Sequence, residues 1–142
     1  MVRLRTAAVV PGTPLAEREA AGEFVLPDDI EVARELRDFL GQLGDARLEL
    51  RSDHALNLLP GLEGSLPDDR DRLITMLDEF LVLPRDEQAR YAVGVRLGIY
   101  SDLGDRLDSR RRALLEQQFA GYRQPTADEL LQEATALRAR FI

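Results

Sequence analysis

The stretch Pro27–Arg51, PDDIEVARELRDFLGQLGDARLELR, decides the fold because its hydrophobic period changes partway along it. Pro27-Asp28-Asp29 is typical of a helix start. Apolar residues then recur with helical spacing, at Ile30, Ala33, Leu36, Leu40 and Leu43. Arg47–Arg51 instead alternates polar and apolar residues, as a strand with one buried face does. The stretch therefore predicts an amphipathic helix followed by a short strand.

A second strand-like run, Val2–Val10, lies upstream of this helix. It alternates at first and becomes wholly apolar from Ala7 onward, which is typical of a strand that is increasingly buried. Pro11-Gly12 ends the run, because proline lacks the amide donor that a strand needs. From there to Gly22 we expect a loop or an irregular helix. A strand, a helix and a strand in this order predict a βαβ unit with parallel strands and a right-handed crossover.

Helical patterns alone follow this unit. Ser65 and Asp68 can satisfy the first amides of a helix, and the apolar stripe of that helix follows at Leu73, Ile74, Leu77, Phe80 and Leu81. A second helix is expected from about Asp86, with Ala89, Val93, Leu97 and Tyr100 on its inner face. Gly94 and Gly98 weaken that helix but allow a close neighbour.

Two more helices are predicted toward the carboxyl terminus. Asp108 or Ser109 can cap the first, which carries Leu114, Leu115 and Phe119 and has Gly121 at its carboxyl-terminal cap. Thr126 and Glu129 form the capping box of the last helix, whose apolar face is Leu130, Leu131, Ala134, Leu137 and Phe141. The fold class is thus predominantly helical α+β, with one strand-helix-strand unit followed by about four helices. We divide the chain into a βαβ portion, residues 1–60, and a helical extension, residues 61–142.

Two parallel strands do not make an independent sheet, because parallel sheets are usually covered on both faces and need more strands. Two interpretations follow. Either four helices support the two strands in a small α+β domain, or the chain is the carboxyl-terminal end of a larger sheet or partial β/α barrel.

Composition narrows the class of protein. The 142 residues are 44% apolar, enough for one globular unit with a core. The net charge of −7 disfavours a surface that binds phosphates, so no nucleic-acid partner is expected. Zero cysteines and one histidine exclude, within this chain, a disulfide, a thiolate-bound cluster and an all-histidine metal site. No run of about 20 apolar residues occurs, so we expect no membrane partner and a cytoplasmic location.

Candidate functional residues gather in two loops that follow the predicted strands. In Arg51–Pro60, Ser52 or Asp53 can cap a helix; alternatively, His54 transfers protons with Asp53 as its orienter. Asn57 adds a further hydrogen-bonding side chain to this loop. The other loop, Pro11–Leu15, is either a tight turn or a place where the backbone approaches a ligand.

Five segments carry a family resemblance through their order along the chain: Val2–Thr6, Pro11–Leu15, Gly22–Phe24, Arg51–His54 with Asn57, and Gly64–Asp69. Together they resemble the carboxyl-terminal part of radical S-adenosylmethionine (radical SAM) proteins, over most of residues 2 to 83. The resemblance implies a partial β/α barrel in which the first strand here is one of the last. It also implies that Gly12 and Thr13 border S-adenosylmethionine. Ser52, Asp53, His54 and Asn57 would then face the substrate or close the rim of the barrel.

The family's reaction requires three cysteines that hold a four-iron, four-sulfur cluster, and this chain has none. The sequence therefore predicts a fragment of a radical SAM iron-sulfur enzyme that completes the barrel and caps its substrate side without being catalytic alone. Its partner would be the upstream radical SAM half, in the same or another chain, which would hold the cluster and S-adenosylmethionine. One alternative is a self-contained helical protein-interaction module with an acidic surface. Another is a small enzyme that uses His54.

Overall fold

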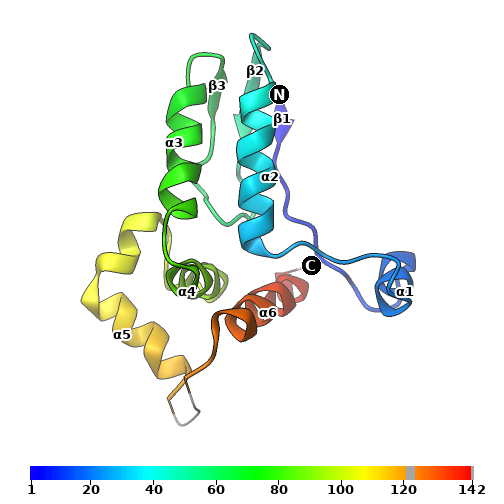
Figure 1. Cartoon of the computed structure of the whole chain (residues 1–142), viewed down its shortest axis with the longest axis vertical. Coiled ribbons are helices and arrows are strands. Elements are labelled where there is room, and N and C mark those ends of the chain that lie inside the picture. Colours follow the sequence, from blue (N-terminus) through cyan, green and yellow to red (C-terminus); the bar gives the residue numbers. More distant parts are fainter. Residues whose placement is uncertain (121–123, 142) are drawn as a thin grey trace.

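The computed structural model describes residues 1–120 and 124–141, and it confirms a predominantly helical α+β fold (Figure 1). Its α-helices are α1 (Pro14–Ala20), α2 (Asp29–Gln42), α3 (Arg70–Leu81), α4 (Arg85–Arg96), α5 (Ser109–Gln118) and α6 (Ala127–Leu137). Its strands are β1 (Val2–Arg3), β2 (Leu48–Arg51) and β3 (Gly64–Leu66). Two 3-10 helices are η1 (Leu103–Leu107) and η2 (Arg138–Phe141). None of the described helices combines the length and apolar character that crossing a bilayer requires.

The sheet has the order β1-β2-β3. β1 runs parallel to β2, with Val2 opposite Leu50, so the predicted pair of parallel strands is confirmed. β3 runs antiparallel to β2, and it corrects the prediction that Ser65 helps to cap the helix that follows. Ser65 is therefore a strand residue and caps no helix: its amide donates to the carboxylate of Asp69, 2.8 Å away. α3 begins after Asp69, which makes no side-chain cap.

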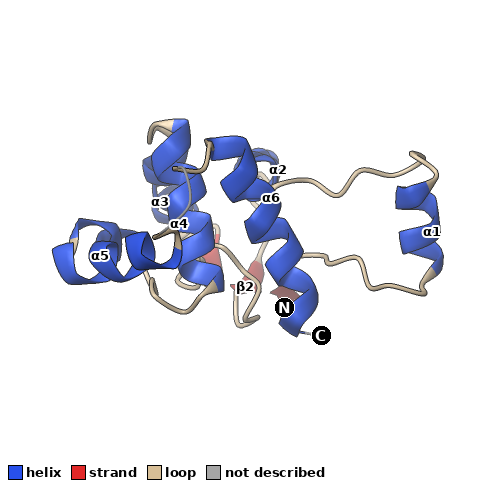
Figure 2. Ribbon diagram, turned by 90° about the horizontal axis from the view of Figure 1, so that it is seen from below, coloured by secondary structure: helices blue, strands red, loops and turns tan. Residues whose placement is uncertain are grey.

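β1 is much shorter than the predicted strand. The Leu4 amide still donates to the Arg51 carbonyl at 2.8 Å, but β2 ends at Arg51, and the apolar residues beyond have no strand to pair with. The chain then forms α1, a short helix capped by Thr13, whose hydroxyl accepts from the Ala16 amide. α1 contains no buried residue, and Figures 1 and 2 show it held away from the other helices on two extended segments.

α2 is the central helix, and its start agrees with the prediction. Asp28 caps it and forms a capping box with Glu31. Ile30, Ala33 and Leu40 are buried on its inner face, as the helical spacing predicts. The helix packs against α3 and, less extensively, against α4 and α6, while β2 carries the buried Leu50 beside it. The core therefore lies between the sheet and the helices that follow it.

α4 and α6 form the other main helix pair. Gly94 does admit a close neighbour, which is the ring of Tyr100: a Cβ on Gly94 would lie 2.2 Å from the ring carbon Cδ2. That ring stacks on Tyr91, with centroids 5.9 Å apart. Gly98 lies beyond the last residue of α4 and has φ +69°, so it belongs to the turn that ends the helix.

The last two helices begin at the predicted caps. Asp108 accepts from two amides of α5, and Thr126 forms a capping box with Glu129 in α6. On α5, Leu115 is buried and Leu114 is exposed. The predicted cap at Gly121 and the side chain of Phe141 lie outside the described residues.

Candidate functional site

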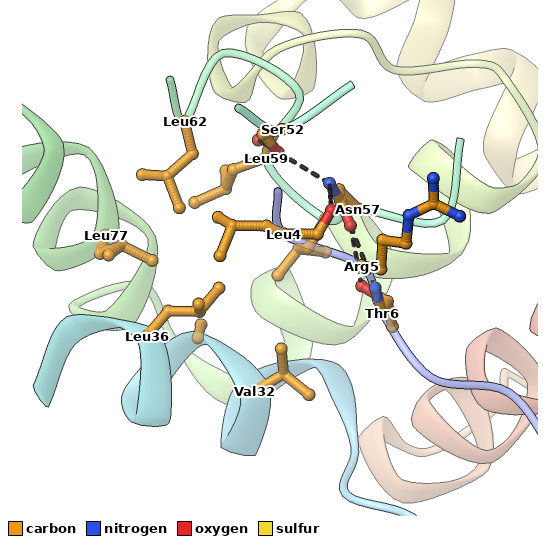
Figure 3. Close-up of a pocket in the computed structure, with 12 residues that line it drawn as sticks. Leu4, Arg5, Thr6, Val32, Leu36, Ser52, Asn57, Leu59, Leu62 and Leu77 are labelled. Atoms are coloured by element: carbon orange, nitrogen blue, oxygen red, sulfur yellow. Dashed lines mark hydrogen bonds between the residues drawn. The ribbon is translucent and has the colours of Figure 1, made fainter. Parts of the chain in front are cut away.

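Asn57 joins the carboxyl ends of the two parallel strands (Figure 3). Its Nδ2 donates to the Leu4 carbonyl at 3.1 Å and to the Ser52 hydroxyl at 2.9 Å. Its Oδ1 accepts from the amide and the hydroxyl of Thr6, at 3.2 and 3.3 Å. An asparagine side chain has two N–H donors and two lone pairs, so these four contacts use its full capacity.

Ser52 completes this link. It is buried, and its hydroxyl donates to the Leu59 carbonyl at 3.1 Å, which folds the loop after β2 back on itself. The structure thus brings together two of the four residues that we expected to face a substrate, Ser52 and Asn57. Their polar atoms bind each other and the backbone, so they hold the strand ends in place.

Asp53 and His54 take different positions from this pair. Asp53 lies on the surface and pairs with Arg3, with 3.1 Å between Oδ2 and Nη1. The Nδ1 atom of His54 accepts from the Leu56 amide at 3.3 Å, and its carbonyl accepts from the Asn57 amide. Among the described residues, no hydrogen bond joins Asp53 to His54. Asp53 therefore does not orient the histidine in the way that general-base catalysis requires.

Gly12 and Thr13 lie at the start of α1, on the segment that extends away from the helices. The Thr13 hydroxyl donates to the Val10 carbonyl at 2.7 Å while it caps α1. Gly12 has φ +82°, a left-handed conformation that favours glycine. Both observations agree with the tight-turn interpretation of this loop. The structure does not bring the two candidate loops together.

An apolar cavity of about 80 Å³ lies between Asn57 and α2 (Figure 3). Its walls are mostly aliphatic side chains, from Leu4, Val32, Ala33, Leu36, Leu58, Leu59, Leu62 and Leu77. Arg5, Thr6, Ser52 and Asn57 are the polar residues that line it. Small-molecule sites usually enclose about 300–1,000 Å³, so this cavity alone holds only a small apolar group.

Sequence reasoning missed a buried charged cluster formed by Asp29, Arg96 and Arg138. Arg96 pairs with Oδ1 of Asp29, and Nη2 of Arg138 lies 3.2 Å from the same oxygen. At most 1% of each side chain is exposed. Burial lowers the pKa of Arg96, an effect that the neighbouring Asp29 carboxylate opposes. The cluster joins the start of α2 to the end of α4 and to η2.

A sequence signal for this cluster does exist. Arg96 follows Ala89, Ala92 and Val93 at helical spacing, and Arg138 follows Leu131 and Ala134 in the same way. Both arginines therefore continue an apolar stripe, where a charged residue needs a buried partner.

The donor chemistry of the chain does not fit the iron-sulfur cluster that the family resemblance implies, because such clusters bind cysteine thiolates and the chain has no cysteine. Within residues 1–120 and 124–141, no group of three or more histidine and carboxylate side chains is placed to hold a metal ion. Comparison with family models, curated proteins and solved structures finds no match to this chain.

Proposed function

We propose that this chain is the carboxyl-terminal portion of a radical SAM enzyme, where it completes the β/α barrel and covers the substrate side without being catalytic alone. The observation that supports this most is the edge of the sheet at β1. β1 lies parallel to β2 and, in the part of the chain that the structure describes, pairs with no strand on its other side. Each strand of a closed barrel has two neighbours, so a preceding barrel strand would pair with β1 at this edge.

The chemistry of the edge suits this role. The Leu4 amide points to β2, where it binds the Arg51 carbonyl. Because successive amides of a strand point in opposite directions, the Arg3 amide points to the open edge. Asn57 ties the carboxyl ends of β1 and β2 together, and in a barrel those ends lie at the rim where active sites form.

The proposal assigns the iron-sulfur cluster and its chemistry to the upstream part of the enzyme, since no residue here fits the cluster. Gly12 and Thr13 would border S-adenosylmethionine from the α1 segment. The Thr13 hydroxyl is already engaged in the α1 cap, so a contact there would be made mainly by the backbone. Ser52 and Asn57 would close the rim, while Asp53 and His54 would face the substrate.

The test begins with the coding DNA upstream of Met1. We expect it to encode a three-cysteine motif, either in frame with this chain or in a neighbouring reading frame. Co-expression of that product with the chain should yield a complex that binds iron and S-adenosylmethionine. Arg3→Pro removes the outward amide of β1 and should abolish co-purification. Arg3→Ala is the matched control, because it removes the same side chain and its ion pair with Asp53 but keeps the amide.

Two results would contradict the proposal: a longer reading frame without the cysteine motif, or an upstream product that never binds this chain. Equal co-purification of Arg3→Pro and Arg3→Ala would show that the β1 edge is not the contact. If the chain is monomeric, unfolds cooperatively and does not bind the upstream product, the results would favour the self-contained helical interaction module instead.

A further inference from the structure

A second cavity, of about 330 Å³, adjoins the apolar one. The two share Arg5, Thr6, Val32 and Leu36 in their walls. We call the 80 Å³ cavity the inner chamber and the 330 Å³ cavity the outer chamber. The outer chamber has six further lining residues, Ala7, Leu26, Pro27, Glu35, Phe39 and Arg138. Together the chambers reach the size of ordinary small-molecule sites.

The inner chamber suits an aliphatic group. Leucines, with Val32 and Ala33, make up most of its wall, and Figure 3 shows Leu36, Leu62 and Leu77 converging on it. Its polar lining residue Asn57 already has four hydrogen-bond partners. Apolar cavities without available polar partners remain dry and accept apolar molecules.

The outer chamber is bounded by a buried positive charge. Arg138 lines it, and its Nη1 donates at 2.9 Å to the carbonyl of Pro27, which also lines it. The Nε of Arg138 is buried and has no hydrogen-bond partner within residues 1–120 and 124–141. In the cluster behind it, two arginines share the carboxylate of Asp29, so among the residues that the structure describes one positive charge is in excess. An anion in the outer chamber would balance that charge, and the exposed Glu35 of α2 is the one carboxylate among the lining residues of this chamber.

We propose that the two chambers form a binding site for a small aliphatic carboxylate, with the end of its tail in the inner chamber and its carboxylate in the outer chamber near Arg138. The juxtaposition of a leucine-lined cavity and an excess buried positive charge carries this assignment. The proposed carboxylate site uses residues of this chain alone. A negative result for this site would therefore not contradict the radical SAM proposal, and a negative result for that proposal would not contradict this site.

Octanoate, 1-octanol and acetate separate the contributions of tail and charge. Each is titrated into the full chain, and amide chemical shifts are followed by NMR. We expect octanoate to perturb Thr6, Val32 and Leu36, and to bind at least about tenfold more tightly than octanol, because a charge-assisted hydrogen bond contributes about that much. Acetate has no tail and should not bind measurably. Equal affinities for octanoate and octanol would overturn the role of the charge.

Leu36→Phe tests the position of the site. Leu36 lines both chambers, so a larger ring there should narrow the passage between them and weaken octanoate binding about tenfold or more. Leu114→Phe makes the same substitution at an exposed position of α5, outside both walls, and should bind octanoate as the unmodified chain does. Unchanged binding by Leu36→Phe would refute the site. If Leu36→Phe fails to fold, the NMR titration of the unmodified chain still tests the site. Octanoate-induced shift changes that do not include the shared wall residues would then refute it.

Discussion

Asp29→Asn should destabilise the protein severely. The substitution keeps the shape of the side chain and removes one negative charge from the cluster with Arg96 and Arg138. Arginine stays protonated in proteins, so two buried guanidinium groups would lose the one carboxylate that they pair with in the described part of the chain. At most 1% of each side chain of the cluster is exposed, so water would screen the remaining charges only weakly.

The expected loss is about 3–5 kcal/mol, the usual cost of removing one partner from a buried ion pair. That is a large share of the roughly 5–15 kcal/mol by which a folded domain is stable. Urea unfolding followed by circular dichroism at the helix band measures it directly. With a denaturant dependence of about 2 kcal/mol per molar, the unfolding midpoint should fall by roughly 2 M.

Asp28→Asn is the matched control, one residue earlier. Asp28 caps α2 by accepting from the amides of Ile30 and Glu31, and asparagine caps helices about as well as aspartate. We expect this variant to lose less than about 1 kcal/mol.

A second comparison tests the charge excess itself. Arg96→Met leaves one aspartate with one arginine, a balanced pair, so it should cost less than Asp29→Asn. The reasoning fails if Asp29→Asn is no more destabilising than Asp28→Asn, or if Arg96→Met proves the more damaging of the two.

Three further predictions concern packing, hydrogen bonding and pH. Gly94→Ala should destabilise the fold by about 1–2 kcal/mol in urea unfolding, because its methyl group would strike the ring of Tyr100; Gly41→Ala in α2, with open space around it, should be neutral or stabilising by up to about 1 kcal/mol. Asn57→Asp should lower stability by about 2 kcal/mol or more, because its amide nitrogen, which donates to two oxygens, becomes an acceptor; a urea midpoint equal to that of the unmodified chain would contradict this. The hydrogen bond from the Ser65 amide, together with the neighbouring Arg72, lowers the pKa of Asp69 below its ordinary value of 3.8. The stabilising contribution of the Asp69 carboxylate is therefore present above pH 3.8 and is lost as the pH falls through the lowered pKa. In Asp69→Asn that part of the acid-induced loss should disappear from unfolding midpoints measured between pH 6 and pH 2, and an unchanged pH profile would count against it.

Local signals allowed the sequence to predict most helices. A cap involves residues within three or four positions of each other, so Asp28 and Thr126 could be recognised as helix starts from their neighbours alone. The inner face of α2 followed from spacing in the same way. The period-two run Arg47–Arg51 also predicted a strand correctly, because one of its faces is buried and the other is not.

The candidate site was predicted only in part. The composition of Arg51–Pro60 pointed to a cluster of hydrogen-bonding side chains, and Ser52 and Asn57 do form one. Sequence spacing did not indicate that Asn57 would bind the backbone near Leu4 and Thr6, more than fifty residues away. Nor did it show that Asp53 would lie outside this cluster, paired with Arg3.

The sequence by itself determined the starts of α2, α5 and α6, the inner face of α2 and the absence of cysteine chemistry, because these depend on residue type and short-range spacing. Only the tertiary structure decided that β3 joins the sheet, that β1 ends after two residues, and that Asp29 meets two arginines from distant helices. The physical reason is that a strand needs a neighbour to bind its amides, and a buried charge needs a partner. Both are supplied by segments that approach one another only when the chain folds.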